Sequence, residues 1–265
     1  MSSTARERIF RISLFSMLGA LSLYLAVLFI AMAGLLNFDD IPGILRSREI
    51  LHAIQLTFVT ATVSSLLALI MGLPCAYVLS RFRFRGRFVI DTLLDLPIVL
   101  SPVAVGTGIL LLFQTVPGRW FSENVTLVVF SWLGIILAQF TVISALAIRL
   151  LKATFDEISP RYEKVARVMG CTPARVFFKV DLPMAKRGIL SAWILTWARA
   201  VGEFGATVTV AGATALKTET LSTSIYLHLS TVQISHAAFL MTLMVFIALG
   251  VLLVSRLVMR REVYE

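Results

Sequence analysis

The chain alternates between long hydrophobic runs and shorter polar segments. A helix of about 20 apolar residues is needed to cross a hydrocarbon core of about 30 Å. Runs of this length or more lie at residues 12–36, 54–79, 88–113, 125–151, 188–213 and 234–258. The pattern therefore predicts an all-α membrane protein with six transmembrane helices.

Composition supports this prediction, because 58% of the 265 residues are hydrophobic and only 15% are charged. These proportions exclude a soluble domain. The first run follows three arginines and ends near Ala31-Met32-Ala33, which imitates the cleavage site of a secretory signal. Its apolar stretch is longer than a signal allows, so we interpret it as a retained span.

The positions of Lys and Arg predict the orientation, since short cytoplasmic loops carry an excess of both. With the N-terminus inside, 19 of these residues fall on the inner side, four fall outside, and Arg199 lies within a span. We therefore expect both termini in the cytoplasm. We therefore interpret the net charge of +9 as a topology signal, and the basic clusters indicate contact with lipid headgroups rather than with nucleic acid.

The largest polar segment, Lys152 to Arg187, separates the fourth and fifth hydrophobic runs, and 12 of its 36 residues are charged. Ser159-Pro160 and Thr172-Pro173 each place an N-cap residue before a proline at the first helical position, where no N–H is needed. Gly170 suits the left-handed conformation that ends a helix. The segment therefore predicts two short helices. The first should run from about Arg161 to Met169, with an apolar side of Tyr162, Val165, Ala166 and Met169.

The same segment resembles the cytoplasmic signature of ABC importer permeases, in which Glu-Ala-Ala, three residues, Gly, nine residues and Ile-x-Leu-Pro follow one another. Gly170, Val180 and Leu182-Pro183 are in register with it. The family's Glu and both Ala positions fall on Lys164, Val165 and Ala166, and Glu163 stands one position early. The resemblance implies a type I permease bundle with a cytoplasmic coupling helix. The residues that would couple it to an ATPase are Glu163, Lys164, Ala166, Gly170, Val180, Leu182 and Pro183.

The resemblance also implies the partners and the location. These are two ABC ATPase subunits, a second permease chain expected to be identical, an extracytoplasmic substrate-binding protein and the lipid bilayer of a prokaryotic inner membrane. The residues themselves leave open whether the second permease is identical or a paralogue. A solvated connector without a special role is the alternative interpretation of the polar segment. Such a connector, however, needs neither two capped helices nor the Leu-Pro pair near its end.

No residue pattern indicates chemistry within this chain. A phosphate-binding Gly-x4-Gly-Lys-Ser/Thr is missing, so ATP and Mg²⁺ would be bound by the partner ATPase, and the chain would be a transport subunit rather than an enzyme. We expect no cofactor in this chain. His52, His228 and His236 lack ligand spacing, which predicts no metal site, and Cys75 and Cys171 imply no disulfide.

The fifth run carries two ionisable residues, Arg199 and Glu203, where a lone charge would cost a few kcal/mol. Their spacing of four residues predicts an ion pair that faces the protein interior. The pair could fix helix packing, or it could line or gate a substrate path together with Thr207. Glycines in this run predict close packing against another helix; they are Gly202, Gly205 and Gly212.

The motif Arg199-Ala-Val-Gly-Glu-Phe-Gly-Ala-Thr207 and the later Lys217-Thr-Glu-Thr-Leu221 resemble permeases of molybdate and tungstate importers. Sulfate permeases are related and tend to have Tyr and Ser where Phe204 and Ala206 stand. The resemblance therefore implies import of a tetrahedral oxyanion, with molybdate or tungstate favoured and sulfate or thiosulfate as the alternative.

The third run contains Pro97 and Pro102, each of which removes a helix N–H and predicts a kink or break. Ser101 and Thr107 could then face a path for an anion. A kinked packing helix is the equal alternative. Near the inner end of this run, Asp91 and Asp95 are interpreted as structural partners of the basic loop before it.

Together the hydrophobic runs and the motifs divide the chain into three parts. Residues 1–50 would form a cytoplasmic tail, the first helix and an external loop, residues 51–258 the permease core with its coupling loop 152–187, and residues 259–265 a cytoplasmic tail.

A second class of function is an ion-coupled secondary transporter, which would need no ATPase. Such proteins place ion-binding acids at mid-membrane and often have repeated halves with matching broken helices. Here the deep charges are those of Arg199 and Glu203, and the halves show no visible similarity. Co-purification of a soluble ATPase would distinguish an importer subunit from such a transporter.

Overall fold

The computed structural model of the chain describes residues 3–36, 39 and 41–260. Every regular element in this part is helical, which confirms the predicted all-α class. The elements are α1 (Ser3–Gly34), α2 (Ile41–Arg46), α3 (Arg48–Arg81), α4 (Arg87–Val99), α5 (Pro102–Gln114), α6 (Val116–Asn124), α7 (Trp132–Glu157), α8 (Pro160–Val168), α9 (Pro173–Val176), the π-helix η1 (Phe177–Asp181), α10 (Leu182–Val201), α11 (Gly205–Ala211), α12 (Leu221–Ser230) and α13 (Ile234–Arg260).

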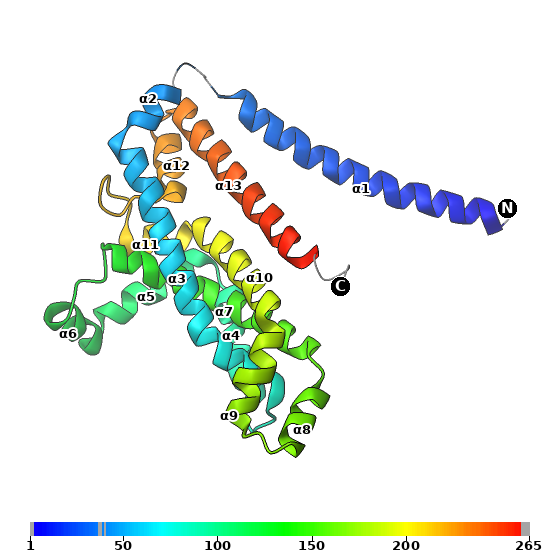
Figure 1. The fold of residues 1–265 in the computed structure, drawn as a ribbon. Coiled ribbons are helices and arrows are strands. Elements are labelled where there is room, and N and C mark those ends of the chain that lie inside the picture. The colour runs from blue at the N-terminus through cyan, green and yellow to red at the C-terminus, as the bar shows by residue number, and fades with distance from the viewer. Residues whose placement is uncertain (1–2, 37–38, 40, 261–265) are drawn as a thin grey trace.

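Helix α1 stands apart from the rest of the molecule (Figure 1). Its apolar stretch, Phe10–Gly34, has no buried residue, and α13 supplies its main contacts. A helix that is hydrophobic on all sides has no polar face to turn toward water. The exposed surface of α1 is therefore suited to lipid or to another apolar protein surface.

The core of the bundle forms where α3 and α7 run side by side, with α10 against both. The two helices are in contact at Gly72 of α3, where an added Cβ would lie 3.4 Å from Ile148 and Leu151 of α7, an ordinary van der Waals distance. The buried apolar cluster where these three helices meet comprises Ala76, Leu79, Ile148, Leu151, Phe155, Ile158, Ala185 and Ala192. This cluster anchors both ends of the polar segment to the bundle.

The third hydrophobic run is broken, as its prolines predict. Helices α4 and α5 are bent by 111° relative to each other. Pro102 opens α5, and the Ser101 hydroxyl accepts a hydrogen bond from the Ala104 N–H at 3.2 Å. The break therefore has a capped helix start on its far side, and the freed backbone donor of Ala104 is satisfied locally.

The fourth hydrophobic run does not coincide with its helix, so the predicted boundaries were wrong. Helix α7 begins at Trp132 rather than near 125, and it continues to Glu157 beyond the predicted 151. Before it lies an irregular stretch in which Phe130 has φ +57° and donates its N–H to the Val210 carbonyl at 3.1 Å. Because this stretch is as apolar as the helix that follows, hydrophobicity alone could not place the start.

The predicted count of six membrane spans is not confirmed. Within the described residues, four helices are long and apolar enough to cross a membrane, and the bent pair α4–α5 adds a fifth if it counts as one span. Those four stretches are Phe10–Gly34, Arg48–Arg81, Trp132–Glu157 and Ile234–Leu257. The fifth hydrophobic run is divided, because α10 ends at Val201 and α11 begins only at Gly205.

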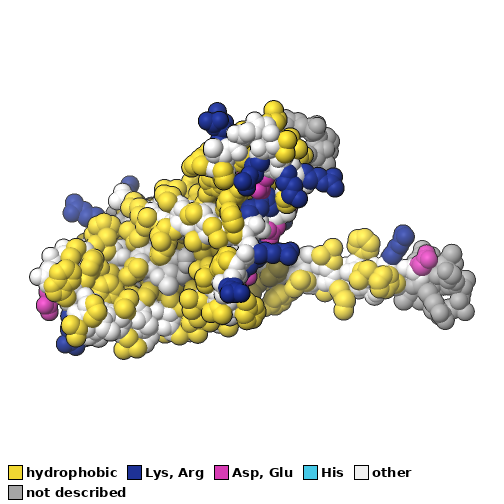
Figure 2. Space-filling view, turned by 90° about the horizontal axis from the view of Figure 1, so that it is seen from below, with side chains coloured by type: hydrophobic (Ala, Val, Ile, Leu, Met, Phe, Trp, Pro, Cys, Tyr) yellow, Lys and Arg dark blue, Asp and Glu magenta, His cyan; other side chains and the backbone are white. Residues whose placement is uncertain are grey.

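One end of the bundle collects α8 and α9, the C-terminal ends of α3 and α7, and the start of α10 (Figure 1). These are the segments whose cations the sequence assigns to the inner side. Figure 2 views the molecule from this end and shows Lys and Arg side chains near Asp and Glu side chains, beside a broad hydrophobic surface. The fold therefore places the predicted cytoplasmic loops together, although the tail from 261 onward lies outside the described residues.

Candidate functional site

The polar segment folds into a compact unit, residues 159–181, which we call the knob. Ser159 caps α8 and Pro160 occupies its first turn, as predicted. After Met169 the chain ends α8 in a Schellman motif: Cys171 N–H bonds the Ala166 carbonyl at 3.1 Å, and Gly170 N–H bonds the Arg167 carbonyl at 3.0 Å. Gly170 has φ +87°, the left-handed conformation expected of it.

The second predicted helix of the knob is short and continues into the next element. Thr172 accepts a hydrogen bond from the Arg175 N–H at 3.3 Å, so the predicted cap is present. After the four residues of α9, the chain passes through η1 directly into α10. The Leu182-Pro183 pair therefore opens α10 instead of ending a separate helix, and Val180 is half-buried within the π-helical turn.

Helix α8 presents apolar side chains to its surroundings. Val168 and Met169 at its end are 88% and 80% exposed, and Tyr162 and Val165 are exposed as well. A hollow of about 640 Å³ lies along this side, lined by Ser159, Arg161, Tyr162, Val165, Ala166, Met169 and Val180. Exposed apolar surface of this kind at the polar end of a membrane bundle indicates a site for another protein.

Glu163 does not belong to that apolar surface. It forms an ion pair with Arg81 at the end of α3, and the two side chains are only 18% and 9% exposed. Arg81 Nη2 also donates to the Ile158 carbonyl at 2.8 Å, just before the knob begins. Burial raises the pKa of the Glu163 carboxyl, and the positive charge of Arg81 partly offsets that rise. Lys164, by contrast, is exposed on α8.

A second polar contact joins the other end of the knob to α3. Tyr77 Oη donates to Asp181 Oδ2 at 3.0 Å, and Asp181 is fully buried. The Tyr77 ring lies edge-on to Phe177 and Phe155, at centroid distances of 4.7 and 5.4 Å. Burial raises the pKa of the Asp181 carboxyl, whereas the Tyr77 hydrogen bond and the nearby Arg81 charge lower it.

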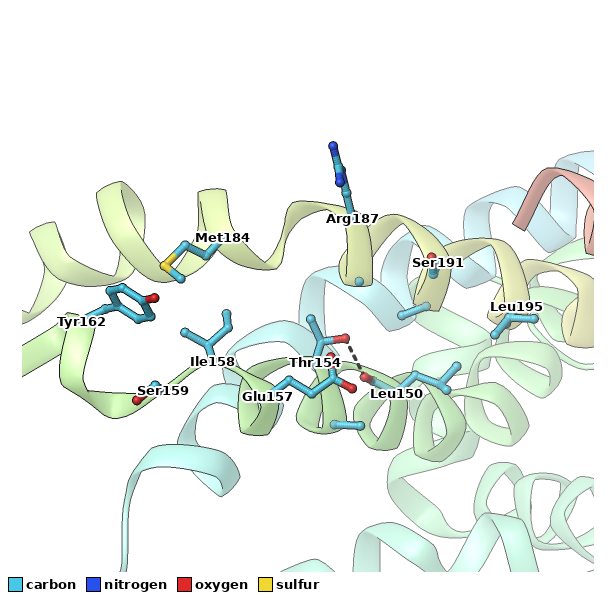
Figure 3. Close-up of a pocket in the computed structure, with 13 residues that line it drawn as sticks. Leu150, Thr154, Glu157, Ile158, Ser159, Tyr162, Met184, Arg187, Ser191 and Leu195 are labelled. Carbon is cyan, nitrogen blue, oxygen red and sulfur yellow. Dashed lines mark hydrogen bonds between the residues drawn. The ribbon is translucent and has the colours of Figure 1, made fainter. Parts of the chain in front are cut away.

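A cavity of about 570 Å³ opens between α7 and α10 beside the knob (Figure 3). Thr154, Glu157 and Ile158 line one wall and Met184, Ser191 and Leu195 the other. At Gly188 of α10 any Cβ would collide with the Thr154 side chain, so the two helices approach closely there. Sequence reasoning missed Gly188, because it lies at the edge of a hydrophobic run rather than among other small residues.

The predicted ion pair within the fifth run is present, with Arg199 Nη1 2.7 Å from Glu203 Oε2. Glu203 is almost fully buried, whereas Arg199 remains 40% exposed. They do not share a helix, since α10 ends between them at Val201. Glu203 Oε1 accepts the Ala206 N–H at 3.0 Å, so this carboxylate also satisfies a donor at the start of α11.

Side chains from two other helices satisfy the carbonyls freed where α10 ends. Gln139 of α7 donates from Nε2 to the Ala200 carbonyl at 3.2 Å, and Ser222 of α12 donates to the Val201 carbonyl at 3.1 Å. Gln139 Oε1 in turn accepts from Ser64 Oγ of α3 at 2.9 Å. Sequence reasoning missed these residues, although a lone Gln in an apolar run was an available signal.

The three glycines of the fifth run have different surroundings. A Cβ at Gly205 would lie 3.0 Å from Pro102 and 3.2 Å from Val103 of α5, so this position packs closely. Gly202 is exposed, and a Cβ added there would meet only carbonyl oxygens of the preceding turn, at 3.9 Å. Gly212 has φ +69° and ψ −166°, a conformation open essentially to glycine alone.

The remaining path candidates lie around the α5–α11 contact. Ser101 and Thr107 are both exposed on this chain, and Thr107 donates to the Val103 carbonyl at 2.9 Å. Thr207 is fully buried, and its hydroxyl has no hydrogen-bond partner among the described residues. Of the three, Ser101 and Thr107 can therefore meet a passing ligand without rearrangement of this chain, whereas Thr207 cannot.

The acidic residues of α4 pair with a different partner from the one expected. Arg149 of α7 lies 2.9 Å from Asp91 and forms a second ion pair with Asp95. The basic loop before α4 was the predicted partner, and that interpretation was wrong. Arg149 is close because α4 packs along α7, a contact that sequence order does not reveal.

The sequence matches the family described as binding-protein-dependent transport system inner membrane component over residues 64–262. It is 40% identical over 185 residues to a probable molybdenum ABC transporter permease protein of Haloferax volcanii, covering 67% of each protein. It is 32% identical over 188 residues to the sulfate transport system permease protein CysT of Escherichia coli K12, covering 70% of this chain and 68% of CysT. It is 31% identical over 207 residues to the molybdate/tungstate transport system permease protein WtpB of Pyrococcus abyssi, covering 77% of this chain and 79% of WtpB.

Solved structures share the fold at low sequence identity. A chain of a bacterial alginate ABC transporter, crystallised with an alginate-bound periplasmic protein, superposes with a TM-score of 0.77 at 19% identity and covers 98% of this chain and 96% of its own. A chain of the methionine ABC transporter MetNI gives a TM-score of 0.63 at 16% identity, covering 79% of this chain and 94% of its own. The bundle therefore has the type I importer permease fold.

Proposed function

We propose that this chain, which belongs to the family of binding-protein-dependent transport system inner membrane components, carries a tetrahedral oxyanion for an ATP-driven importer. The family makes it the membrane-spanning permease subunit of an ABC importer. Our first candidate substrate is molybdate or tungstate. Sulfate is the second candidate, since sulfate and molybdenum permeases match the chain at similar identity.

The observation that carries the proposal is the exposed apolar surface of α8, a helix capped at both ends. Val168 and Met169 project from its end, and Gly170 closes the helix so that the chain turns back at once. A separate ATPase subunit that covers these side chains would remove them from water, which favours binding. We therefore assign α8 as the coupling helix.

The proposed assembly contains two such knobs, each on one ATPase subunit, because one chain supplies half of a path. A second, identical permease would form the other half, and an extracytoplasmic binding protein would deliver the anion. ATP and Mg²⁺ would bind between the ATPase subunits, so this chain would need no nucleotide site. The structural relative from the alginate transporter is itself bound to a periplasmic protein, which supports such an arrangement.

The proposed orientation places the knob and both termini in the cytoplasm. Cysteines substituted at Arg83 and Lys164 would then be shielded from an impermeant thiol reagent added outside intact cells, whereas one at Lys217 would react. All three positions are exposed on this chain, so burial within it does not determine the outcome. Labelling at Lys164 from outside would reverse the topology and remove the coupling role.

The proposed path runs past the exposed guanidinium of Arg199. A dianion that loses hydration needs a compensating charge, but a cation that binds it tightly would stop its passage. Pairing with Glu203 leaves Arg199 partly neutralised, which suits a transient contact. Ser101, at the break between α4 and α5, and Thr107, within α5, would add hydroxyl groups to this path.

Selection between molybdate and sulfate would depend mainly on the binding protein. Within this chain, Ala206 is fully buried, so a Ser there would need a hydrogen-bond partner, and Phe204 contacts the Tyr226 ring at 5.2 Å. These two positions are the ones at which sulfate permeases tend to carry Ser and Tyr. They favour molybdate or tungstate for this chain.

The substrate is tested by elemental analysis of the cognate binding protein, purified after growth with molybdate, tungstate and sulfate supplied together. Molybdenum or tungsten at about one atom per protein would support our first candidate. Bound sulfur as sulfate would select the second. In parallel, the purified permease should bring down a soluble ATPase in stoichiometric amount, and the absence of any such ATPase would instead favour a secondary transporter.

A further inference from the structure

Two polar contacts attach the knob to α3, one at α8 and one at its far end, where Phe177 also packs on the apolar cluster of the bundle. Helix α8 has no buried residue, so apolar burial does little to fix its position. The Arg81–Glu163 ion pair joins α8 to α3, and both side chains are largely buried. Through its hydrogen bond to the Ile158 carbonyl, the same guanidinium also holds the residue that leads into the knob.

One turn earlier on α3, Tyr77 holds the far end of the knob. Its hydroxyl donates to Asp181, the last residue of η1, at 3.0 Å. Residues four apart share one face of a helix, so Tyr77 and Arg81 form a single row on α3. This row reaches the entry, the middle and the exit of the knob, at Ile158, Glu163 and Asp181.

We propose that Tyr77 and Arg81 form a two-point clamp through which movement of the knob is transmitted to α3. They are positioning residues, since neither needs to touch ATP or the anion. The inference rests on the proposed docking of an ATPase on α8. It adds the route by which a displacement of α8 enters the membrane bundle.

Helix α3 is suited to pass a displacement on, because its hydroxyl groups contact α10 and α12. Thr62 Oγ1 accepts from Trp197 Nε1 at 3.0 Å, and Ser65 Oγ accepts from Trp193 Nε1 at 3.1 Å. Thr57 Oγ1 accepts the N–H of Leu221, the first residue of α12, at 2.8 Å. The break between α10 and α11, which follows Arg199, lies between these contacts along the chain.

A purely structural role would have a different signature. If the clamp residues only stabilise the folded permease, removing them lowers the amount of assembled complex, and each remaining complex works normally. If they transmit force, the complex assembles and hydrolyses ATP, but fewer anions cross per ATP. The ratio of anions imported to ATP hydrolysed therefore separates the two roles.

The test uses the full complex of permease, ATPase and binding protein in proteoliposomes loaded with ATP. Tyr77→Phe removes one hydroxyl and keeps the ring between Phe155 and Phe177, and Arg81→Met removes the guanidinium. Arg83→Met is the matched control, because Arg83 is an exposed arginine two residues further along.

We expect the import ratio to fall at least about fivefold in both clamp variants, the lower end of usual coupling between sites. Arg83→Met should match wild type, and the exchange Arg81→Glu with Glu163→Arg should recover part of the ratio. An unchanged ratio in Tyr77→Phe, or a loss of uptake that only mirrors lost complex, overturns the clamp. If wild type and Arg83→Met also fail to bind the ATPase, the proposed function is wrong and the clamp falls with it.

Discussion

Arg199 and Glu203 form a 2.7 Å ion pair across the end of α10, yet only Glu203 is buried. The carboxylate also accepts the Ala206 N–H, so it holds the start of α11 as well as the guanidinium. Arg199 is 40% exposed and reaches the surface of the chain. Anchoring and contact with a ligand therefore fall on different members of the pair.

The first prediction separates the capping role of Glu203 from its charge. Glu203→Ala should reduce the unfolding free energy by about 1–3 kcal/mol, because a buried N–H at Ala206 loses its acceptor. Glu203→Gln keeps an acceptor oxygen and should lose less. Thermal unfolding of the purified complex, followed by tryptophan fluorescence, measures both. An equal loss of unfolding free energy in the two variants would show that the charge of Glu203, and not its hydrogen bond to Ala206, stabilises the fold.

The second prediction concerns Arg199. The double variant Arg199→Met, Glu203→Gln leaves no buried charge without a partner, so it should assemble at wild-type levels. Its molybdate uptake at matched complex content should fall, because the path loses its exposed cation. Uptake equal to wild type would confine the pair to packing and move the search for the path to Ser101 and Thr107.

The third prediction concerns Gly170, for which a Cβ would meet no atom within 4 Å. A larger side chain therefore has room within this chain, but residues other than glycine rarely adopt the φ of +87° that Gly170 has. Gly170→Ala and Gly170→Glu should each destabilise the knob by about 1 kcal/mol, and Gly170→Asn by less. ATPase retained on the tagged permease provides the measurement. A severe loss in Gly170→Glu alone would place Gly170 inside the docking interface.

The fourth prediction is a pH dependence that arises at Glu163. Its pKa is raised by burial above the ordinary value of 4.5, so the folded protein binds this proton more readily than the unfolded one. This preferential binding of a proton stabilises the folded protein fully below pH 4.5, and the stabilisation is lost as pH rises through the raised pKa of Glu163. Compared with Glu163→Gln, wild type should therefore lose unfolding free energy from about pH 4.5 upward. Parallel stability curves for the two proteins would contradict it.

The helices and caps of the knob could be predicted closely because their signals are local. Ser159 and Thr172 each bond a backbone N–H two or three residues away, and Gly170 needs only its own φ. Such contacts depend on residue type and spacing, which the sequence displays directly. The same holds for the break at Pro102, where the missing N–H is a property of the residue itself.

The contacts that attach the knob could not be predicted in the same way. Arg81 and Glu163 are 82 positions apart, and many basic residues lie near each acid in the sequence. Arg149 meets Asp91 only because α4 packs along α7. The break after Val201 is hidden for a further reason, since the apolar pattern continues through it while Gln139 and Ser222 satisfy the freed carbonyls.

The proposed function is tested by ATP-dependent uptake of molybdate into proteoliposomes that contain the permease, its ATPase and the binding protein. We predict uptake that requires all three proteins and hydrolysable ATP, that competing tungstate suppresses strongly, and that excess sulfate suppresses weakly. Uptake of sulfate but not molybdate would contradict the substrate assignment. Uptake without the ATPase, driven by an ion gradient alone, would contradict the role of this chain in an ATP-driven importer.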